Sequence, residues 1–388
     1  MCKSYISNVV KNMPDSGIKD FFDVANSLDG ALSLGVGEPD FATPEHIRKA
    51  AIDSVLRADT KYTDNRGTVE LRQAVAEYLK KFDLHYNGAD EVLITMGASE
   101  GIDLALRTLV NPGDEVLVTE PCYVSYEPCV ELCGGIPVAV ETKACDRFRL
   151  TAAGLSEKIT EKTKVLLLSF PNNPTGAIME RTDLEAIAEI AKERDIFVIS
   201  DEIYAELTYG KQHVSIASLP GMAERTLVLN GFSKAFAMTG WRLGFAAGPK
   251  DVIFHMNKIH QFTTMSAGTT SQYAALEALG NPVREAELER MRTEYDKRRG
   301  IMVKGFLEME LDVAVPEGAF YVFPSVASLG MNSQEFCRQL LKEQKVAVIP
   351  GDAFGACGDG FVRCSYAYSE DVIRKCLDKI AVFVRSRR

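Results

Sequence analysis

The sequence lacks any apolar run long enough to cross a bilayer, which takes roughly 20 consecutive residues. Its apolar stretches are short, as in VLLL at residues 165–168. The first 22 residues, MCKSYISNVVKNMPDSGIKDFF, scatter polar and charged side chains and lack the continuous apolar centre of a secretion signal. We therefore expect no membrane partner and a cytoplasmic location.

The sequence also lacks a cluster of basic residues. It carries 44 Lys and Arg against 54 Asp and Glu, a formal net charge of -10, and no stretch gathers the cations into one stripe. Proteins that bind the phosphate backbone of nucleic acids depend on such a stripe. We expect no nucleic-acid partner.

Paired cysteine motifs are absent. Nine cysteines run from Cys2 to Cys376, and none forms a C-x-x-C pair, so reduced thiols are expected. Cys129 and Cys133 are close in sequence, but the five histidines are scattered and no second cysteine pair lies nearby. We interpret both cysteines as packing residues and predict no metal site.

The composition is that of a globular protein. With 388 residues, 46% hydrophobic and 25% charged, the chain can bury one or two large cores, which excludes disordered and fibrous classes. No repeat, low-complexity tract or Pro/Ser-rich linker stands out. Thr43 and Pro44 signal the start of a helix over 44–58, and apolar residues at helical spacing predict another over 68–82.

Six short apolar runs then alternate with helical patterns. They cover residues 91–97, 114–121, 164–171, 195–202, 225–232 and 243–249. Strands buried on both faces have this composition, so we predict an α/β fold with a mostly parallel sheet between helices. After about residue 285 a long charged helix leads into shorter units. We predict an N-terminal arm and part of a small domain in 1–45, a large domain in 46–285 and a small α+β domain in 286–388.

Ligands of open α/β sheets bind beyond the carboxyl ends of the strands, so the residues there are candidates for a site. Five stand out, and each also has a plain structural interpretation. Ser99, in the small-residue turn GASEG before a helix, suits a phosphate or is part of a tight turn. Tyr123 stacks on a flat ligand or packs in the core, and Asn173 in PNNPTG binds a ligand oxygen or caps a turn. Asp201 forms an internal ion pair or serves as a ligand-binding acid. Lys234 extends its amine to water, or has its pKa lowered enough to act as an amine nucleophile.

Taken together, these five residues describe one site. A phosphate group, a flat ring, an acid and a reactive amine are what pyridoxal phosphate requires, because its aldehyde bonds to a lysine and its ring nitrogen needs an anionic partner. The sequence therefore predicts this cofactor.

Several motifs resemble those of the fold-type I, class I and II aminotransferases. GFSKAFAMTGWRLG matches the lysine signature of that family, and GVGEPDF, YTDNRG, GASEG, NNPTG, SDEIY and FVRCSYA match its other blocks in order. The resemblance spans residues 17 to 388. It is closest to the prokaryotic aromatic, aspartate and N-acetyl-diaminopimelate aminotransferases. This resemblance implies a mostly parallel sheet of seven strands between helices. It also implies transfer of the α-amino group of an L-amino acid, aromatic, aspartate or related, to 2-oxoglutarate by a ping-pong mechanism.

The resemblance also implies a role for each matching residue. Lys234 bonds to the cofactor and moves the proton, Asp201 pairs with its ring nitrogen, and Tyr204 and Asn173 bind its ring oxygen. The phosphate is held by Ala98, Ser99, Ser233 and Arg242, the ring is stacked by Tyr123, and the substrate carboxylate is clamped by Arg363 with help from Gly37. In the family, the residue matching Tyr62 reaches the phosphate of the neighbouring subunit, which implies a homodimer.

The identity of the amino donor stays open at this level. In the family that the chain resembles, one branch of the relatives that act on aspartate carries a lysine where this chain has Ser99. Lys61 and Arg66 are the alternative cations for a distal carboxylate, or are surface charges. A carbon–sulfur lyase on the same scaffold needs the same lysine, acid and phosphate site. A non-catalytic regulatory domain is a further alternative, opposed by the presence of Lys234.

Overall fold

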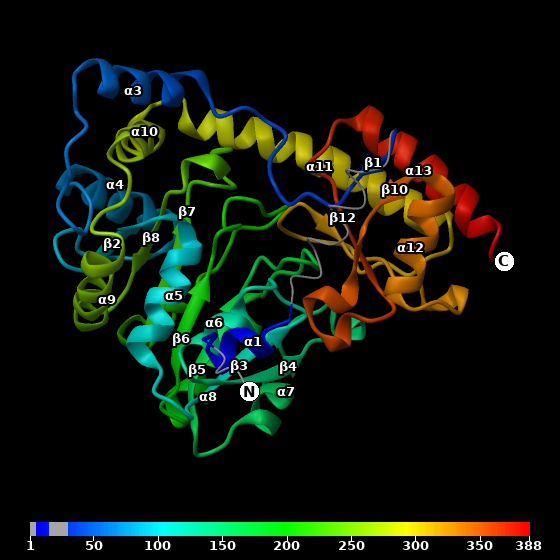
Figure 1. The fold of residues 1–388 in the computed structure, drawn as a ribbon, viewed down its shortest axis with the longest axis horizontal. Helices are drawn as coiled ribbons and strands as arrows, with labels where there is room; N and C mark the ends of the chain where they lie inside the picture. The colour runs from blue at the N-terminus through cyan, green and yellow to red at the C-terminus, as the bar shows by residue number, and fades with distance from the viewer. Residues whose placement is uncertain (1–4, 15–29) are drawn as a thin grey trace.

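A computed structural model describes residues 5–14 and 30–388 of the chain. Cys2 and most of the N-terminal region up to residue 29 lie outside the described residues, as does the start of the family resemblance at residue 17. Figure 1 shows a large sheet flanked by helices and a smaller unit beside it. The long helix α11 (Arg284–Glu308) runs along the top from one to the other.

The large sheet has seven strands in the order β2-β8-β7-β6-β5-β3-β4. These are β2 (Val92–Thr95), β3 (Glu115–Glu120), β4 (Ile136–Glu141), β5 (Thr163–Ser169), β6 (Phe197–Asp201), β7 (Thr226–Gly231) and β8 (Gly244–Ala247). Strand β8 runs antiparallel to both of its neighbours, β2 and β7, and the other pairs of this sheet are parallel. The mostly parallel α/β fold predicted from the sequence is therefore confirmed.

Both faces of the large sheet are buried. Along β5, Leu166 and Leu168 pack into one apolar cluster and Leu167 packs into another on the opposite face. This alternation explains why the strands appear in the sequence as continuous apolar runs. The helices that cover the sheet and its β2 end are α3 (Glu45–Leu56), α4 (Val69–Leu79), α5 (Gly97–Leu109), α6 (Tyr126–Leu132), α7 (Ala152–Lys158), α8 (Arg181–Glu193), α9 (Lys250–Thr263) and α10 (Thr269–Gly280).

Strand β4 was missed in the sequence. It forms one edge of the sheet, pairs only with β3, and has an exposed residue at each end, Ile136 and Glu141. Because an edge strand is partly solvated, IPVAVE lacks the continuous apolar pattern that marked the other six strands. The predicted helices over 44–58 and 68–82 correspond to α3 and to α4 followed by a short 3₁₀ turn at Lys80–Phe82.

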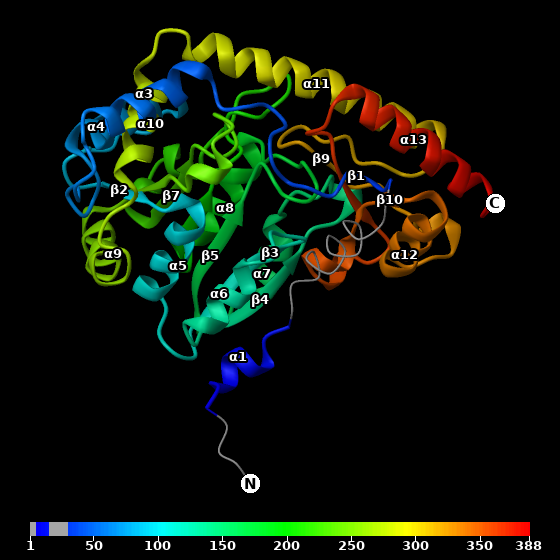
Figure 2. The same ribbon diagram turned by 45° about the horizontal axis from the view of Figure 1, so that its top comes forward.

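The smaller unit combines short strands with helices. It contains β9 (Tyr321–Val322), β10 (Val346–Ala347), β11 (Ile349–Pro350), β12 (Val362–Ser365), α11, α12 (Ser333–Gln344) and α13 (Glu370–Arg385). Strand β1 (Leu32–Ser33), from the N-terminal region, pairs in parallel with β10. This pairing brings the segment after residue 33 over the large sheet. The short helix α1 (Asn8–Asn12) buries no side chain and projects from the body in Figure 2.

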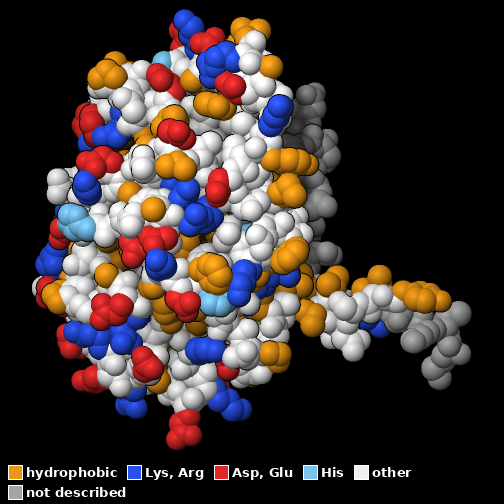
Figure 3. Space-filling view, turned by 90° about the vertical axis from the view of Figure 1, so that its left-hand side faces the viewer, with side chains coloured by type: hydrophobic (Ala, Val, Ile, Leu, Met, Phe, Trp, Pro, Cys, Tyr) orange, Lys and Arg blue, Asp and Glu red, His pale blue; other side chains and the backbone are white. Residues whose placement is uncertain are grey.

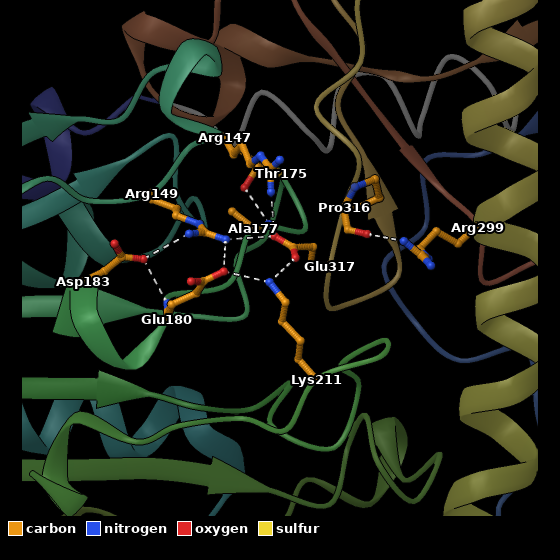
Figure 4. A network of polar contacts seen from close by, with 10 residues as sticks. All are labelled: Arg147, Arg149, Thr175, Ala177, Glu180, Asp183, Lys211, Arg299, Pro316 and Glu317. Atoms are coloured by element: carbon orange, nitrogen blue, oxygen red, sulfur yellow. Dashed lines mark hydrogen bonds and ion pairs between the residues drawn. The ribbon is translucent and has the colours of Figure 1, made fainter.

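A network of ion pairs connects the smaller unit to the loops around the large sheet (Figure 4). Glu317, which follows α11 and precedes β9, lies 2.7 Å from Lys211 Nζ and 3.1 Å from Arg149 Nη2. Arg149 also contacts Glu180 and Asp183 at the start of α8. Hydrogen bonds and positive charge from Lys211 and Arg149 lower the pKa of Glu180 to about 2. The segment leading into β9 is therefore held against the loops of the large sheet.

Candidate active site

A cavity of about 380 Å³ lies at the carboxyl edge of the large sheet. All of the predicted site residues except Tyr62 line it: Gly37, Ala98, Ser99, Tyr123, Asn173, Asp201, Tyr204, Ser233, Lys234, Arg242 and Arg363. A larger cavity of about 900 Å³ between α11 and α13 contains none of them. The position of the smaller cavity follows the rule for open α/β sheets.

Lys234 follows β7 and reaches into the cavity. Its Nζ donates a hydrogen bond of 2.6 Å to the Gly37 carbonyl, which comes from the segment after β1. Burial lowers the pKa of Lys234 to about 8, and the positive charges of Arg363 and Arg242 contribute, against the opposing charge of Glu38. An amine with this pKa is neutral in a useful fraction near neutral pH, as a nucleophile or proton acceptor requires.

Asp201 ends strand β6 and is 4% exposed. Its carboxylate accepts hydrogen bonds from the Tyr126 hydroxyl at 2.8 Å and from the Ile203 backbone N–H at 3.2 Å. The Tyr126 hydroxyl also lies 2.8 Å from Ser169 Oγ. Burial raises the pKa of Asp201 to about 6, although the bond from Tyr126 opposes this. A cationic group in the cavity would lower it again and keep the carboxylate ionised.

The start of α5 forms a cradle for an anion. Helix α5 begins at Gly97 directly after β2, so the backbone N–H groups of Ala98 and Ser99 lie in its first turn. Arg242 lies beside them, since a Cβ at Gly97 would be 2.8 Å from its Nη2. A Cβ at Gly244 would lie 2.6 Å from Ala98 N, so only glycine permits this close approach of two backbones.

Arg242 adopts φ +51°, a conformation that costs L-residues roughly 1–3 kcal/mol. Its Nη1 donates to the Thr239 carbonyl at 3.0 Å, which holds the guanidinium near the helix start. Ser233, beside Lys234, lines the same part of the cavity. A helix N-terminus, a hydroxyl and an arginine are a donor set suited to a phosphate.

Arg363 lies on β12 and is 3% exposed. Its Nη1 donates to Asn173 Oδ1 at 3.0 Å and its Nη2 donates to the Gly35 carbonyl at 2.5 Å. The guanidinium lies over the rings of Tyr321 and Phe354, with its Cζ at 4.6 and 4.8 Å from their centroids. Two of its five N–H groups are used, and Nε has no partner, so three donors are free for a carboxylate.

Three further residues surround the space between Lys234 and Asp201. The Tyr204 hydroxyl lies 2.8 Å from the Tyr321 hydroxyl. Asn173 Oδ1 accepts a hydrogen bond from Arg363, which leaves the side-chain N–H groups of Asn173 available to another acceptor. The ring of Tyr123 packs edge-on against Tyr126, with 5.7 Å between centroids, and lines the cavity.

Tyr62, Lys61 and Arg66 lie outside this cavity. Tyr62 is 81% exposed and borders a separate surface cavity together with Lys61. Arg66 donates to the Ala89 carbonyl at 2.8 Å and borders another surface cavity. Within a single chain, the structure does not bring these residues to the site.

Tyr126, Ser169 and Tyr321 line the cavity and were missed in the sequence. Ser169 ends β5, so the strand-end rule that identified Asp201 could have found it. Tyr126 lies on α6 and Tyr321 on a two-residue strand, and neither position carries a periodic signal.

The described part of the chain shows no helix long and apolar enough to span a membrane. Among the same residues, no group of three or more His, Cys, Asp or Glu side chains is placed to hold a metal ion. Cys129 and Cys133 are free thiols that pack against the apolar cluster under α5 and α6, as predicted.

The residues present fit pyridoxal phosphate. The glycine-bounded cradle at α5 suits its phosphate, Asp201 suits a protonated ring nitrogen, and Lys234 suits its aldehyde. The unpartnered Nε of Arg363 indicates that a further acceptor belongs in the same cavity.

Comparison with known proteins gives the family. The family model for aminotransferase class I and II matches residues 29–380. A putative aminotransferase of Bacillus subtilis (strain 168) is 48% identical over 98% of both chains, and the aromatic-amino-acid aminotransferase 2 of Thermococcus litoralis is 42% identical over 99% of both. The aspartate aminotransferase of Thermus thermophilus, solved with maleate, superposes with a TM-score of 0.94 at 38% identity, over 98% of this chain and 100% of that one. The chain therefore belongs to the class I and II aminotransferases, and it is a pyridoxal-phosphate-dependent enzyme of fold type I.

Proposed function

We propose that this enzyme transfers the α-amino group of an L-amino acid to 2-oxoglutarate in two half-reactions, with ping-pong kinetics. The observation that carries this proposal is the presence of Arg363, with three free N–H groups, in the same cavity as the Lys234 amine. Pyridoxal phosphate, when bound, supplies an aldehyde carbon for the amino group and a ring that accepts the electron pair released at the substrate α-carbon.

Lys234 moves the proton. Its amine, with a pKa near 8, takes the proton from the substrate α-carbon and returns it to the carbon that receives the amino group. The Gly37 carbonyl accepts a hydrogen bond of 2.6 Å from Nζ, which orients the amine toward the segment that follows β1. Asp201 holds a proton on the cofactor's ring nitrogen, and the bond from Tyr126 keeps its carboxylate ionised and fixed.

The remaining residues bind and orient. Ala98, Ser99, Ser233 and Arg242 bind the phosphate, Tyr123 packs on the ring, and Asn173 and Tyr204 bind its oxygen. Arg363 binds the substrate carboxylate as a bidentate pair. Because Arg363 donates a hydrogen bond to Asn173, a residue of the substrate subsite is tied directly to a residue of the cofactor subsite.

The amino donor is proposed from the relatives. One is named for aromatic amino acids, and another for aspartate, with the dicarboxylate maleate present in its structure. We propose a donor that is aromatic, aspartate or a related amino acid. Ser99, in place of the lysine found in one branch of the relatives that act on aspartate, weighs against strict aspartate specificity.

A homodimer is also proposed, with Tyr62 reaching the site of the partner subunit. Large hydrophobic side chains are exposed on the side of the molecule where α3 and α9 lie, among them Leu56 at 78% and Phe262 at 87%. Figure 3 shows hydrophobic side chains among charges of both signs on this side. We further propose the division into residues 1–45, 46–285 and 286–388 and a cytoplasmic location.

A panel of amino donors tests the function. Aromatic amino acids, aspartate and acyl-diaminopimelate would each be paired with 2-oxoglutarate, and release of the donor's oxo acid would be followed. Parallel lines in double-reciprocal plots are expected for ping-pong kinetics. Production of pyruvate and ammonia without an acceptor oxo acid would instead indicate the carbon–sulfur lyase.

A further inference from the structure

Tyr321 is a buried tyrosine that the proposed reaction leaves without a role. It is 1% exposed and begins strand β9. Its hydroxyl lies 2.8 Å from the Tyr204 hydroxyl, and the Arg363 guanidinium lies over its ring. One side chain therefore contacts both the residue proposed to bind the cofactor's ring oxygen and the residue proposed to bind the substrate carboxylate.

Tyr321 is fixed relative to the large sheet, although β9 belongs to the smaller unit. Just before it, the Gly318 N–H donates to the Gly176 carbonyl at 2.8 Å, and the Ala319 N–H donates to the Leu207 carbonyl at 2.8 Å. These acceptors lie in the loops that follow β5 and β6. Together with the ion pairs of Glu317 in Figure 4, they hold the Tyr321 backbone where the two subsites meet.

The ring of Tyr321 sets the plane of Arg363. Guanidinium groups are attracted to aromatic faces within about 6 Å, and here the rings of Tyr321 and Phe354 both lie within that distance of the Arg363 guanidinium. The bonds to Asn173 and Gly35 fix the rotation of the guanidinium within that plane. The three free N–H groups are thereby held in one orientation before a carboxylate arrives, which reduces the entropy that binding must lose.

The hydroxyl of Tyr321 acts on Tyr204. Burial raises the pKa of both phenols, so each stays neutral and carries one proton. When Tyr204 donates its proton to the cofactor's ring oxygen, the 2.8 Å contact requires Tyr321 to donate to Tyr204. A hydroxyl that accepts one hydrogen bond becomes a stronger donor in the next.

We propose that Tyr321 is a positioning residue with two separable parts: its hydroxyl strengthens the bond from Tyr204 to the cofactor, and its ring orients Arg363 for the substrate carboxylate. This inference rests on the proposed function. A Cβ at Gly37 would lie 2.5 Å from the Tyr321 hydroxyl, so glycine at that position leaves room for the tyrosine.

Two substitutions separate the parts. Tyr321→Phe removes the hydroxyl and keeps the ring, whereas Tyr321→Leu removes both. Tyr366→Phe is the matched control, because Tyr366 is also fully buried in the smaller unit, and its hydroxyl donates to the Ala319 carbonyl at 3.2 Å rather than to Tyr204. Two quantities would be measured on each holoenzyme: the pH midpoint of the cofactor's visible absorbance change, and the dissociation constant of 3-phenylpropionate, a carboxylate without an amino group.

The phenylalanine variant should raise the pH midpoint by about half a unit to one unit, because a cofactor ring oxygen that receives a weaker hydrogen bond makes the Lys234 nitrogen joined to the cofactor more basic. Its dissociation constant for 3-phenylpropionate should stay within twofold of the unsubstituted enzyme. The leucine variant should show the same midpoint shift and bind 3-phenylpropionate about 3- to 30-fold more weakly. Tyr366→Phe should change neither quantity.

An unchanged midpoint in Tyr321→Phe would overturn the role of the hydroxyl, and so would an equal shift in Tyr366→Phe. Equal loss of 3-phenylpropionate binding in the phenylalanine and leucine variants would overturn the role of the ring. If the leucine variant does not fold, the phenylalanine variant still tests the hydroxyl. Failure of the proposed function would appear differently, as absence of transamination by the unsubstituted holoenzyme.

Discussion

Replacing Arg363 with lysine should reduce kcat/KM for the amino donor by about 30- to 1,000-fold. Lysine keeps the charge but offers one ammonium in place of a planar fork, so one of the two bonds to the substrate carboxylate is lost. A hydrogen bond to a charged group contributes about 1.5–3 kcal/mol, and the lost stacking on Tyr321 and Phe354 adds about 0.5–1 kcal/mol. The sum, about 2–4 kcal/mol, converts to the stated range at about 1.36 kcal/mol per factor of ten.

The assay is the initial rate of oxo-acid release at donor concentrations well below KM, with saturating cofactor. Arg72→Lys is the matched control, because Arg72 is also 3% exposed and bonds the carbonyls of Gly88 and Ala89 at 2.7 Å, on α4 and outside the cavity. That variant should lose stability but keep kcat/KM within threefold. The reasoning would be refuted if Arg363→Lys stayed within threefold of the unsubstituted enzyme, or if both variants lost the same activity.

Three further predictions concern the cofactor side. Lys234→Ala should abolish turnover, since proton transfer alone contributes about 10² to 10⁴ in rate; near-normal transamination would contradict the assignment. In Gly244→Ala the added Cβ would lie 2.6 Å from Ala98 N, so this variant should destabilise the apoprotein by about 1–3 kcal/mol in denaturant unfolding. It should also weaken cofactor binding, measured by fluorescence titration. In the control Gly240→Ala the added Cβ has nothing within 4 Å, so cofactor binding should stay unchanged. In the folded apoprotein the pKa of Lys234 is about 8, whereas its ordinary value, expected in the unfolded chain, is near 10.5. Between pH 8 and 10.5 the unfolded chain therefore binds more protons than the folded protein, and the contribution of Lys234 to the free energy of unfolding rises with pH. The amount by which the Lys234→Met apoprotein is more stable than the unsubstituted apoprotein should therefore shrink between pH 8 and 10.5. A difference in the free energy of unfolding that stays constant over this range would contradict a lowered pKa.

The local chemistry of the site could be predicted because it follows the strands. Asp201 ends a buried strand, and Asn173 and Lys234 lie in the loops that follow two others. Parallel strands bring their carboxyl ends to one edge of the sheet. The six predicted strands are present for the same reason, since burial on both faces leaves an unbroken apolar pattern. The edge strand β4 has a solvated side, and its pattern is lost.

Residue types and their order along the chain thus determined the sheet, the position of the cavity and the groups at its base. Tertiary structure alone decided what surrounds them. Gly37 meets Lys234 because β1 pairs with β10, Tyr126 reaches Asp201 from α6, and Tyr321 joins Tyr204 to Arg363 from a two-residue strand. These contacts connect segments far apart in the sequence, and they depend on the order of strands and on packing between units. No periodicity or spacing encodes them, because each contact is satisfied only after both segments have reached their places in the fold.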